Sequence, residues 1–203
     1  HIAVAGQQFE YTFDDIGNRT QTKSGGDDSG LNLRQLTYVP DALNRYTSRS
    51  GQRFIDVLGA SLPSSTAMIN GTSGGIYRKG EYFRKELTWG NDLPAWLSVS
   101  VSAGAFTTSG YRYVPGTAEN FAYDDDGNLI QDGRWTYEWD AENRLIVMRS
   151  LAGSPAPERR IGFEYDYRGR RIRQTVWNAR TGGTKLSDTV YLYDGWNLVA
   201  ELD

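Results

Sequence analysis

Three oxygen-bearing side chains of this sequence are spaced like the ligands of a bound cation. Asp124, Asp126 and Asn128 place oxygen atoms at alternate positions, as the ligands of a calcium-binding loop do. An EF-hand loop also requires glycine at its sixth position and glutamate at its twelfth, where this sequence has Leu129 and Trp135. A turn explains the same residues without an ion, so we predict no metal site and no cofactor.

A pair of carboxylates about 5–9.5 Å apart could hydrolyse a glycosidic bond. Alternation along a strand places Glu138 away from the neighbouring rings, and Asp140 is explained by a turn. The sequence contains no cysteine, and its single histidine is His1, which excludes thiolate chemistry and argues against histidine-dependent catalysis. We therefore predict no catalytic residues and no enzymatic activity, and keep a glycoside hydrolase or lyase as an alternative. The carboxylates that it could use are Glu138, Asp140, Glu142 and Glu164.

Tryptophan rings could instead stack on sugars. Trp135 and Trp139 lie in phase with Tyr137, as residues that share one packed strand face do. The other four fit no such pattern, which makes them the candidates for a glycan-binding surface, although packing between strands is the simpler interpretation for each. These candidates are Trp89, Trp96, Trp177 and Trp196.

One pattern recurs six times and indicates which elements position these side chains. Its form is aromatic, any residue, aromatic, Asp, two free positions, then Gly or Asn. Pro40 replaces the second aromatic of the second copy, and the sixth copy, which ends Tyr193-Asp194-Gly195-Trp196, is less regular. The repeated residues are Tyr11, Phe13, Asp14 and Gly17; Tyr38, Asp41 and Asn44; Phe121, Tyr123, Asp124 and Gly127; Tyr137, Trp139, Asp140 and Asn143; Phe163, Tyr165, Asp166 and Gly169; Tyr191, Tyr193 and Asp194.

Each part of the pattern has a physical reason. Two aromatics separated by one residue lie on the same face of a strand. Asp accepts a hydrogen bond from the backbone two residues later, and Gly or Asn three residues later tolerates a positive φ. The chain then returns as a second strand, so every copy predicts a β-hairpin. The fold class is therefore all-β, with antiparallel hairpins stacked into a shared sheet.

The 203 residues form three predicted segments. Hairpin repeats occupy residues 1–53 and 119–203. Residues 54–118 lack the pattern and contain alternating runs such as Leu97, Val99, Val101 and Ala103, which indicates an inserted β subdomain. The chain begins without methionine and shows no signal peptide, so we expect a mature piece or an excised fragment.

The repeats resemble the RHS/YD-repeat family of bacterial surface and secreted proteins. Phe163 to Arg171 and Phe121 to Leu129 are close to its pattern, and Tyr193 to Glu201 resembles the end of such an array in bacteria of the Planctomycetes–Verrucomicrobia kind. The resemblance implies a spiral of β-hairpins that serves as a surface scaffold, an adhesion element or a shell around a toxin. The Asp-Pro motif of self-cleaving members is absent. We therefore predict a non-catalytic structural or interaction module, part of a larger exported protein, with a carbohydrate-binding module as the alternative.

Charge and hydropathy set the expected partners. The net charge is −3, with acidic and basic residues interspersed, which argues against nucleic acid. No apolar stretch approaches the roughly 18 residues of a membrane span. We expect the partners to be adjacent repeats of the parent chain, or a second copy joined through edge strands, with glycans as a further candidate. The expected location is the bacterial cell surface or the extracellular space.

Overall fold

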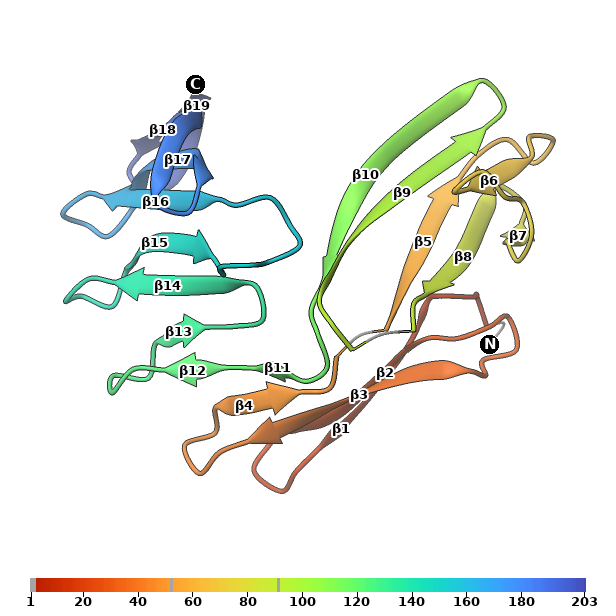
Figure 1. Cartoon of the computed structure of the whole chain (residues 1–203), viewed down its shortest axis with the longest axis horizontal. Coiled ribbons are helices and arrows are strands. Elements are labelled where there is room, and N and C mark those ends of the chain that lie inside the picture. The colour runs from red at the N-terminus through yellow and green to blue at the C-terminus, as the bar shows by residue number, and fades with distance from the viewer. Residues whose placement is uncertain (1–2, 52, 91) are drawn as a thin grey trace. The chain divides into compact units, whose positions relative to one another are not determined.

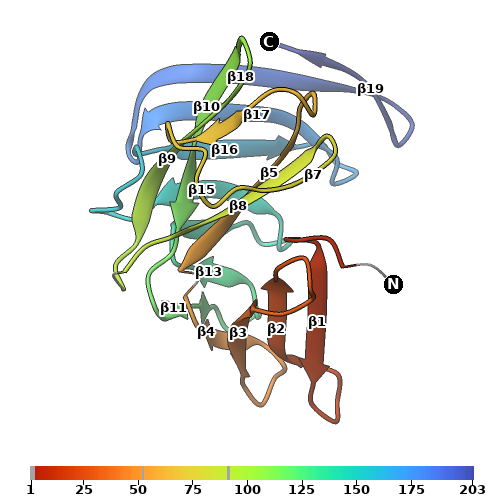
Figure 2. The same cartoon turned by 90° about the vertical axis from the view of Figure 1, so that its right-hand side faces the viewer.

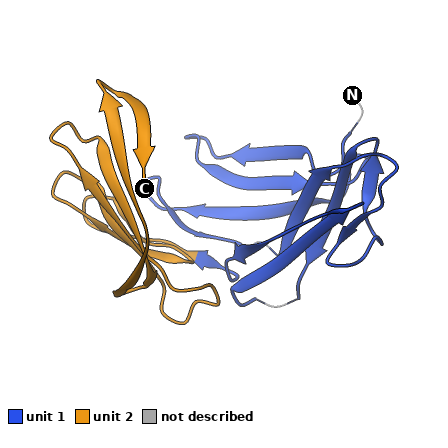
Figure 3. Cartoon of the chain, turned by 90° about the horizontal axis from the view of Figure 1, so that it is seen from above, with its two compact units in different colours: residues 1–119 blue, residues 120–203 orange. Residues whose placement is uncertain are grey.

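The computed structural model describes residues 3–51, 53–90 and 92–203, and every regular element in these ranges is a β-strand. The predicted all-β class is confirmed; His1 lies outside the described residues. The chain divides into two compact units, residues 1–119 and 120–203 (Figure 3). No helix capable of crossing a membrane occurs in the described part of the chain.

The first unit begins with two repeat hairpins in one antiparallel sheet (Figure 1). The strand order is β1-β2-β3-β4-β11, and β11 marks the end of this unit. The strands are β1 (Gln8–Phe13), β2 (Arg19–Gly25), β3 (Leu33–Pro40), β4 (Tyr46–Arg49) and β11 (Glu119–Asn120).

The rest of the first unit consists of two three-stranded sheets, ordered β5-β8-β7 and β10-β9-β6. Ala67, Ile69 and Phe83 are buried together and form the core cluster. The Phe83 ring lies directly on Gly59, its cross-strand partner, because glycine has no side chain to hold it off. The strands are β5 (Phe54–Ala60), β6 (Ala67–Ile69), β7 (Tyr77–Lys79), β8 (Tyr82–Thr88), β9 (Ala95–Ala103) and β10 (Phe106–Val114).

The second unit is one eight-stranded sheet whose strands follow one another in chain order (Figure 2). Every neighbouring pair is antiparallel, so four repeat hairpins lie side by side. The strands are β12 (Ala122–Tyr123), β13 (Leu129–Gln131), β14 (Trp135–Trp139), β15 (Leu145–Ser150), β16 (Arg160–Tyr165), β17 (Arg171–Ala179), β18 (Gly182–Asp194) and β19 (Asn197–Leu202).

All six repeat copies form antiparallel hairpins. In the β14–β15 hairpin, the Asp140 carboxylate accepts the backbone N–H groups of Glu142 at 2.9 Å and Arg144 at 3.0 Å. Asn143 closes the turn in the left-handed region, with φ of 58°. The sixth copy differs, because Gly195 and Trp196 form a two-residue turn between the paired residues Asp194 and Asn197.

The last three hairpins of the second unit are joined by arginines that follow the turns, whereas Asn128 takes this place in the first hairpin and donates to Asn143 at 2.9 Å. The Arg144 guanidinium lies over the Tyr165 ring of the next hairpin at 5.4 Å, and the Tyr165 hydroxyl donates to the Leu145 carbonyl at 2.8 Å. Arg170 lies over Tyr193 in the same way, at 5.0 Å. Each cation–π contact contributes about 0.5–1 kcal/mol where it is exposed. The repeat therefore encodes both a turn and the contact with the next hairpin.

The predicted segment boundaries have a partial counterpart in this architecture. The compact units meet at residues 119 and 120, where the third predicted segment begins. Residues 54–118 supply the two three-stranded sheets, but they belong to the same compact unit as residues 1–53. The boundary between residues 53 and 54 stays a prediction.

Candidate functional site

The turn carboxylates are occupied by hydrogen bonds. Asp140 also accepts the Arg144 Nε–H at 2.8 Å, in addition to two backbone N–H groups. These bonds, led by the Arg144 backbone N–H, hold the pKa of Asp140 below its ordinary value. Asp14, Asp41, Asp124 and Asp166 carry similar sets of bonds, and their pKa values are lowered as well. A carboxylate held in this way serves the turn rather than proton transfer.

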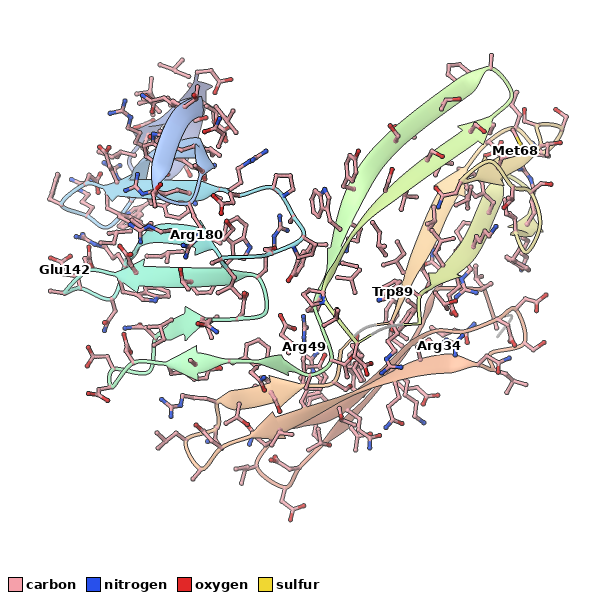
Figure 4. The ribbon with its side chains drawn as sticks, in the orientation of Figure 1. Arg34, Arg49, Met68, Trp89, Glu142 and Arg180 are labelled. Atoms are coloured by element: carbon pink, nitrogen blue, oxygen red, sulfur yellow. The ribbon has the colours of Figure 1, made fainter. Side chains whose placement is uncertain are left out.

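The other carboxylates considered for glycoside hydrolysis lie at the surface. Glu138 pairs with Arg149, and Glu142 pairs with Arg144 at 2.7 Å at the tip of the β14–β15 hairpin (Figure 4). Glu164 is also exposed, 3.7 Å from Arg173.

The burial of the repeat rings differs from copy to copy. Tyr11 and Phe13 of β1 are more than half exposed, and the Arg19 guanidinium lies 5.4 Å from the Tyr11 ring. Rings in the interior copies, such as Tyr137 and Tyr165, are half-buried. The difference arises because β1 is an edge strand, whereas interior hairpins have neighbours on both sides.

The four tryptophan candidates do not form one surface. Trp96 stacks on Tyr111 with ring centroids 5.4 Å apart, and Trp89 lines a cavity of about 150 Å³ in the first unit. Trp177 is half-buried in the middle of the second unit, and Trp196 is 70% exposed at the β18–β19 turn. Trp177 pairs with Lys185 of β18, and Trp196 lies next to Asp194 at the end of the same strand. Lys185 and Asp194 are nine residues apart in β18, which corresponds to about 30 Å. Glycan stacking by any of them stays a prediction.

An acid–arginine network in the first unit joins two carboxylates and two guanidinium groups. Asp56 of β5 and Glu86 of β8 are cross-strand partners. Arg84 bridges them, with its Nε 2.6 Å from Asp56 Oδ1 and its Nη2 3.0 Å from Glu86 Oε2. Arg34, on β3, donates from Nε to Glu86 Oε1 at 3.0 Å (Figure 4). The network therefore ties the repeat sheet to the β5-β8-β7 sheet.

The Asp56 side chain is mostly buried, with 15% of its surface exposed. It lines a cavity of about 510 Å³ whose other walls include Phe9, Phe54, Val99 and Arg112. Gly25 allows the close approach, because a Cβ atom there would lie 2.9 Å from Asp56 Oδ2.

The pKa values of the two carboxyls in the network are shifted in opposite directions. Burial raises the pKa of Asp56, and the charge and hydrogen bond of Arg84 only partly oppose it. Burial also acts on Glu86, but the hydrogen bonds and charges of Arg34 and Arg84 outweigh it and lower the Glu86 pKa. A raised pKa lets Asp56 exchange a proton nearer to neutral pH, whereas the guanidinium groups of Arg34 and Arg84 are already paired with the two carboxylates.

Sequence reasoning missed this network. Asp56 and Glu86 lie outside the repeats, and only the β5–β8 register places one opposite the other. The available signal was the alternation of charged residues in the run from Tyr82 to Thr88, which indicated a strand but not its partner.

Comparisons with known proteins connect part of the chain to nucleases. No family model matches the sequence. The tRNA nuclease WapA of Bacillus subtilis strain 168 is 38% identical to this chain over 80 residues. The tRNA(Glu)-specific nuclease WapA of Bacillus subtilis subsp. natto and the tRNA3(Ser)-specific nuclease WapA of Bacillus spizizenii show the same identity over the same length. The match spans 39% of this chain and about 3% of the length of each relative.

These relatives correct two predictions. The interpretation as a non-catalytic structural or interaction module is wrong, because the similar proteins are named as nucleases. The prediction of no enzymatic activity is wrong for the same reason, and the glycan-directed alternatives gain no support. The physical reason is that a repeat reports the turns of a fold, whereas activity depends on sites that the repeat does not describe.

Proposed function

We propose that these 203 residues belong to a polypeptide that cleaves tRNA. The observation that carries this proposal is the 80-residue similarity, at 38% identity, to three proteins named as tRNA nucleases. The matched stretch is a small part of those proteins, so the activity is proposed for the whole polypeptide. As part of the same proposal, the chain is an RHS/YD-repeat segment that acts outside the bacterial cell.

The acid–arginine network supports the proposal chemically. RNA cleavage requires a group that accepts the proton of a ribose 2′-hydroxyl and cations that stabilise the charge growing on the phosphate. Asp56 has a raised pKa and lines the same cavity as Arg112, which is the cation offered to the phosphate because Arg84 is paired with Asp56 and Glu86. Neither a histidine nor a cysteine is needed for this arrangement.

The test is cleavage of tRNA by the complete polypeptide that carries these residues. Purified protein is incubated with total tRNA from bacteria, and the products are separated on denaturing gels. Discrete fragments, with other structured RNA left intact, would support the proposal. Intact tRNA after prolonged incubation with folded protein would overturn it.

Two matched variants locate the contribution of this chain. Asp56→Asn removes the raised-pKa acid, and Asp140→Asn changes a carboxylate that serves a turn. We expect a loss of cleavage of 100-fold or more for the first variant, on the order reported for general bases, and little change for the second once folding is confirmed. Equal rates for the two variants would rule out Asp56 as the proton acceptor.

A further inference from the structure

Three arginines of the second unit converge at one end of its sheet. Arg149 of β15 and Arg160 of β16 are direct cross-strand partners, so their side chains share one face. Arg180 follows β17, and its Nε donates to the Ser150 carbonyl at 3.0 Å, next to Arg149. Figure 4 shows Arg180 beside β15. We refer to Arg149, Arg160 and Arg180 as the arginine cluster.

Like charges placed opposite each other destabilise a sheet, so this arrangement needs a reason. Arg149 pairs with Glu138, which is about half exposed. In the part of the chain that the structure describes, neither Arg160 nor Arg180 forms an ion pair. Burial lowers the pKa of Arg149, and the charges of Arg160 and Arg180 lower it further, as expected for guanidinium groups that lie close together. The cluster therefore carries an excess of positive charge that an anion would relieve.

An aromatic ring holds Arg160 in position. Trp177 is the cross-strand partner of Arg160 on β17, and the guanidinium lies 4.3 Å from the indole centroid. The ring lies across the sheet because Gly162 has no side chain; a Cβ atom there would be 3.1 Å from Trp177 Cζ3. A guanidinium stacked on a ring keeps its N–H groups in a fixed plane, and such planes bind phosphate through paired hydrogen bonds.

We propose that the arginine cluster, with Trp177, binds the phosphate backbone of RNA. The choice of RNA rests on the proposed tRNA cleavage, whereas the choice of a phosphate-bearing polyanion rests on the cluster itself. Clustered arginines beside an aromatic ring are the chemistry with which proteins follow RNA strands. The net charge of −3 over the whole chain predicted no nucleic-acid partner. RNA binding depends on the local charge, which is positive at the arginine cluster.

The test is binding of fluorescently labelled tRNA to the 203-residue chain, followed by anisotropy over a range of salt concentrations. The variant R149Q/R160Q loses two guanidinium groups of the cluster. The control R168Q/R171Q loses the same charge about 17 Å away, at the β16–β17 turn. Thermal unfolding shows whether each variant is folded.

We expect R149Q/R160Q to weaken tRNA binding on the order of 25-fold at about 0.1 M salt. Each neutralised phosphate of a single strand contributes about 0.7 to the salt slope, so two lost contacts lower the slope by about 1.4, which corresponds to about 25-fold over the tenfold range of salt between about 1 M and 0.1 M. The control should bind within about threefold of the original chain. Equal losses in both variants, no binding at low salt, or equally tight binding of polyglutamate would each overturn the inference.

A second measurement uses the unmodified chain and does not depend on how the variants fold. Phenylglyoxal modifies accessible arginines, and mass spectrometry reports which peptides react. Bound tRNA should protect the peptide that contains Arg160 and leave Arg168 reactive. Protection of Arg168 alone would contradict the assignment. Cleavage of tRNA by the complete polypeptide without this protection would overturn the inference and leave the proposed function standing.

Discussion

Placing a methyl group on Gly59 should destabilise the first unit through a single contact. Gly59 and Phe83 are partners across β5 and β8, and Phe83 is 3% exposed within the core cluster. A Cβ atom at position 59 would lie 2.3 Å from Cζ of the Phe83 ring. Carbon atoms in contact are about 3.5–4.0 Å apart, so the ring would have to retreat by about 1.2–1.7 Å into packed neighbours. Overpacking of this kind costs about 1–3 kcal/mol, and we expect Gly59→Ala to fall in the upper half of that range.

A double-mutant cycle separates this contact from a general effect of alanine. Phe83→Leu removes the part of the ring that a Cβ atom at position 59 would strike, so Gly59→Ala should cost less than about 1 kcal/mol in that background. Gly110→Ala is the matched control, because Gly110 also lies in a strand and has no atom within 4 Å of a Cβ position. It should be neutral, or stabilising by up to about 1 kcal/mol.

The assay is urea unfolding, followed by circular dichroism, together with amide exchange of peptides that cover β5 and β8. Exchange is needed because the chain has two compact units, and it reports the opening of the first unit separately. If the costs of Gly59→Ala and Phe83→Leu simply add within about 0.5 kcal/mol, the ring does not rest on Gly59 and the reasoning is refuted.

Three further predictions concern acid sensitivity, turn geometry and the arginine cluster. Hydrogen bonds from Arg173, then from Lys185, hold the pKa of Asp188 far below its ordinary value of 3.8, so the unfolded chain binds this proton at higher pH than the folded one. Stability should therefore fall as pH drops through about 4, and Asp188→Asn should flatten this dependence in urea midpoints measured between about pH 5 and pH 3; an unchanged slope would contradict the assignment. Gly169 has φ of 77°, so Gly169→Ala should cost about 1–2 kcal/mol in thermal unfolding, whereas Gly169→Asn should cost less because asparagine tolerates the left-handed region, and equal losses would refute the turn argument. Gly162→Val should displace the Trp177 ring, because its side chain would occupy the space of the ring. Tryptophan fluorescence should change and tRNA binding should weaken; a changed fluorescence with unchanged binding would show that the ring does not position Arg160.

Much of the hairpin architecture was predictable because the repeat acts locally. Asp140 reaches backbone groups only two and four residues away, and Asn143 needs no partner to adopt its left-handed conformation. The ring burial was less predictable, because it depends on how many neighbours a strand has. Phe13 and Tyr165 occupy equivalent positions in the pattern, yet only Tyr165 lies between paired hairpins.

The positions of the turns follow from the sequence alone, because the required bonds and backbone angles lie within five residues of each Asp. The folded sheets are needed to bring the charged side chains together: Asp56 with Glu86 and Arg84, and Arg149 with Arg160 and Arg180. Strand pairing sets these neighbours, and a shift of the register by one residue would send each side chain to the opposite face. The net charge sums all charged residues regardless of their positions, so it did not reveal the arginine cluster.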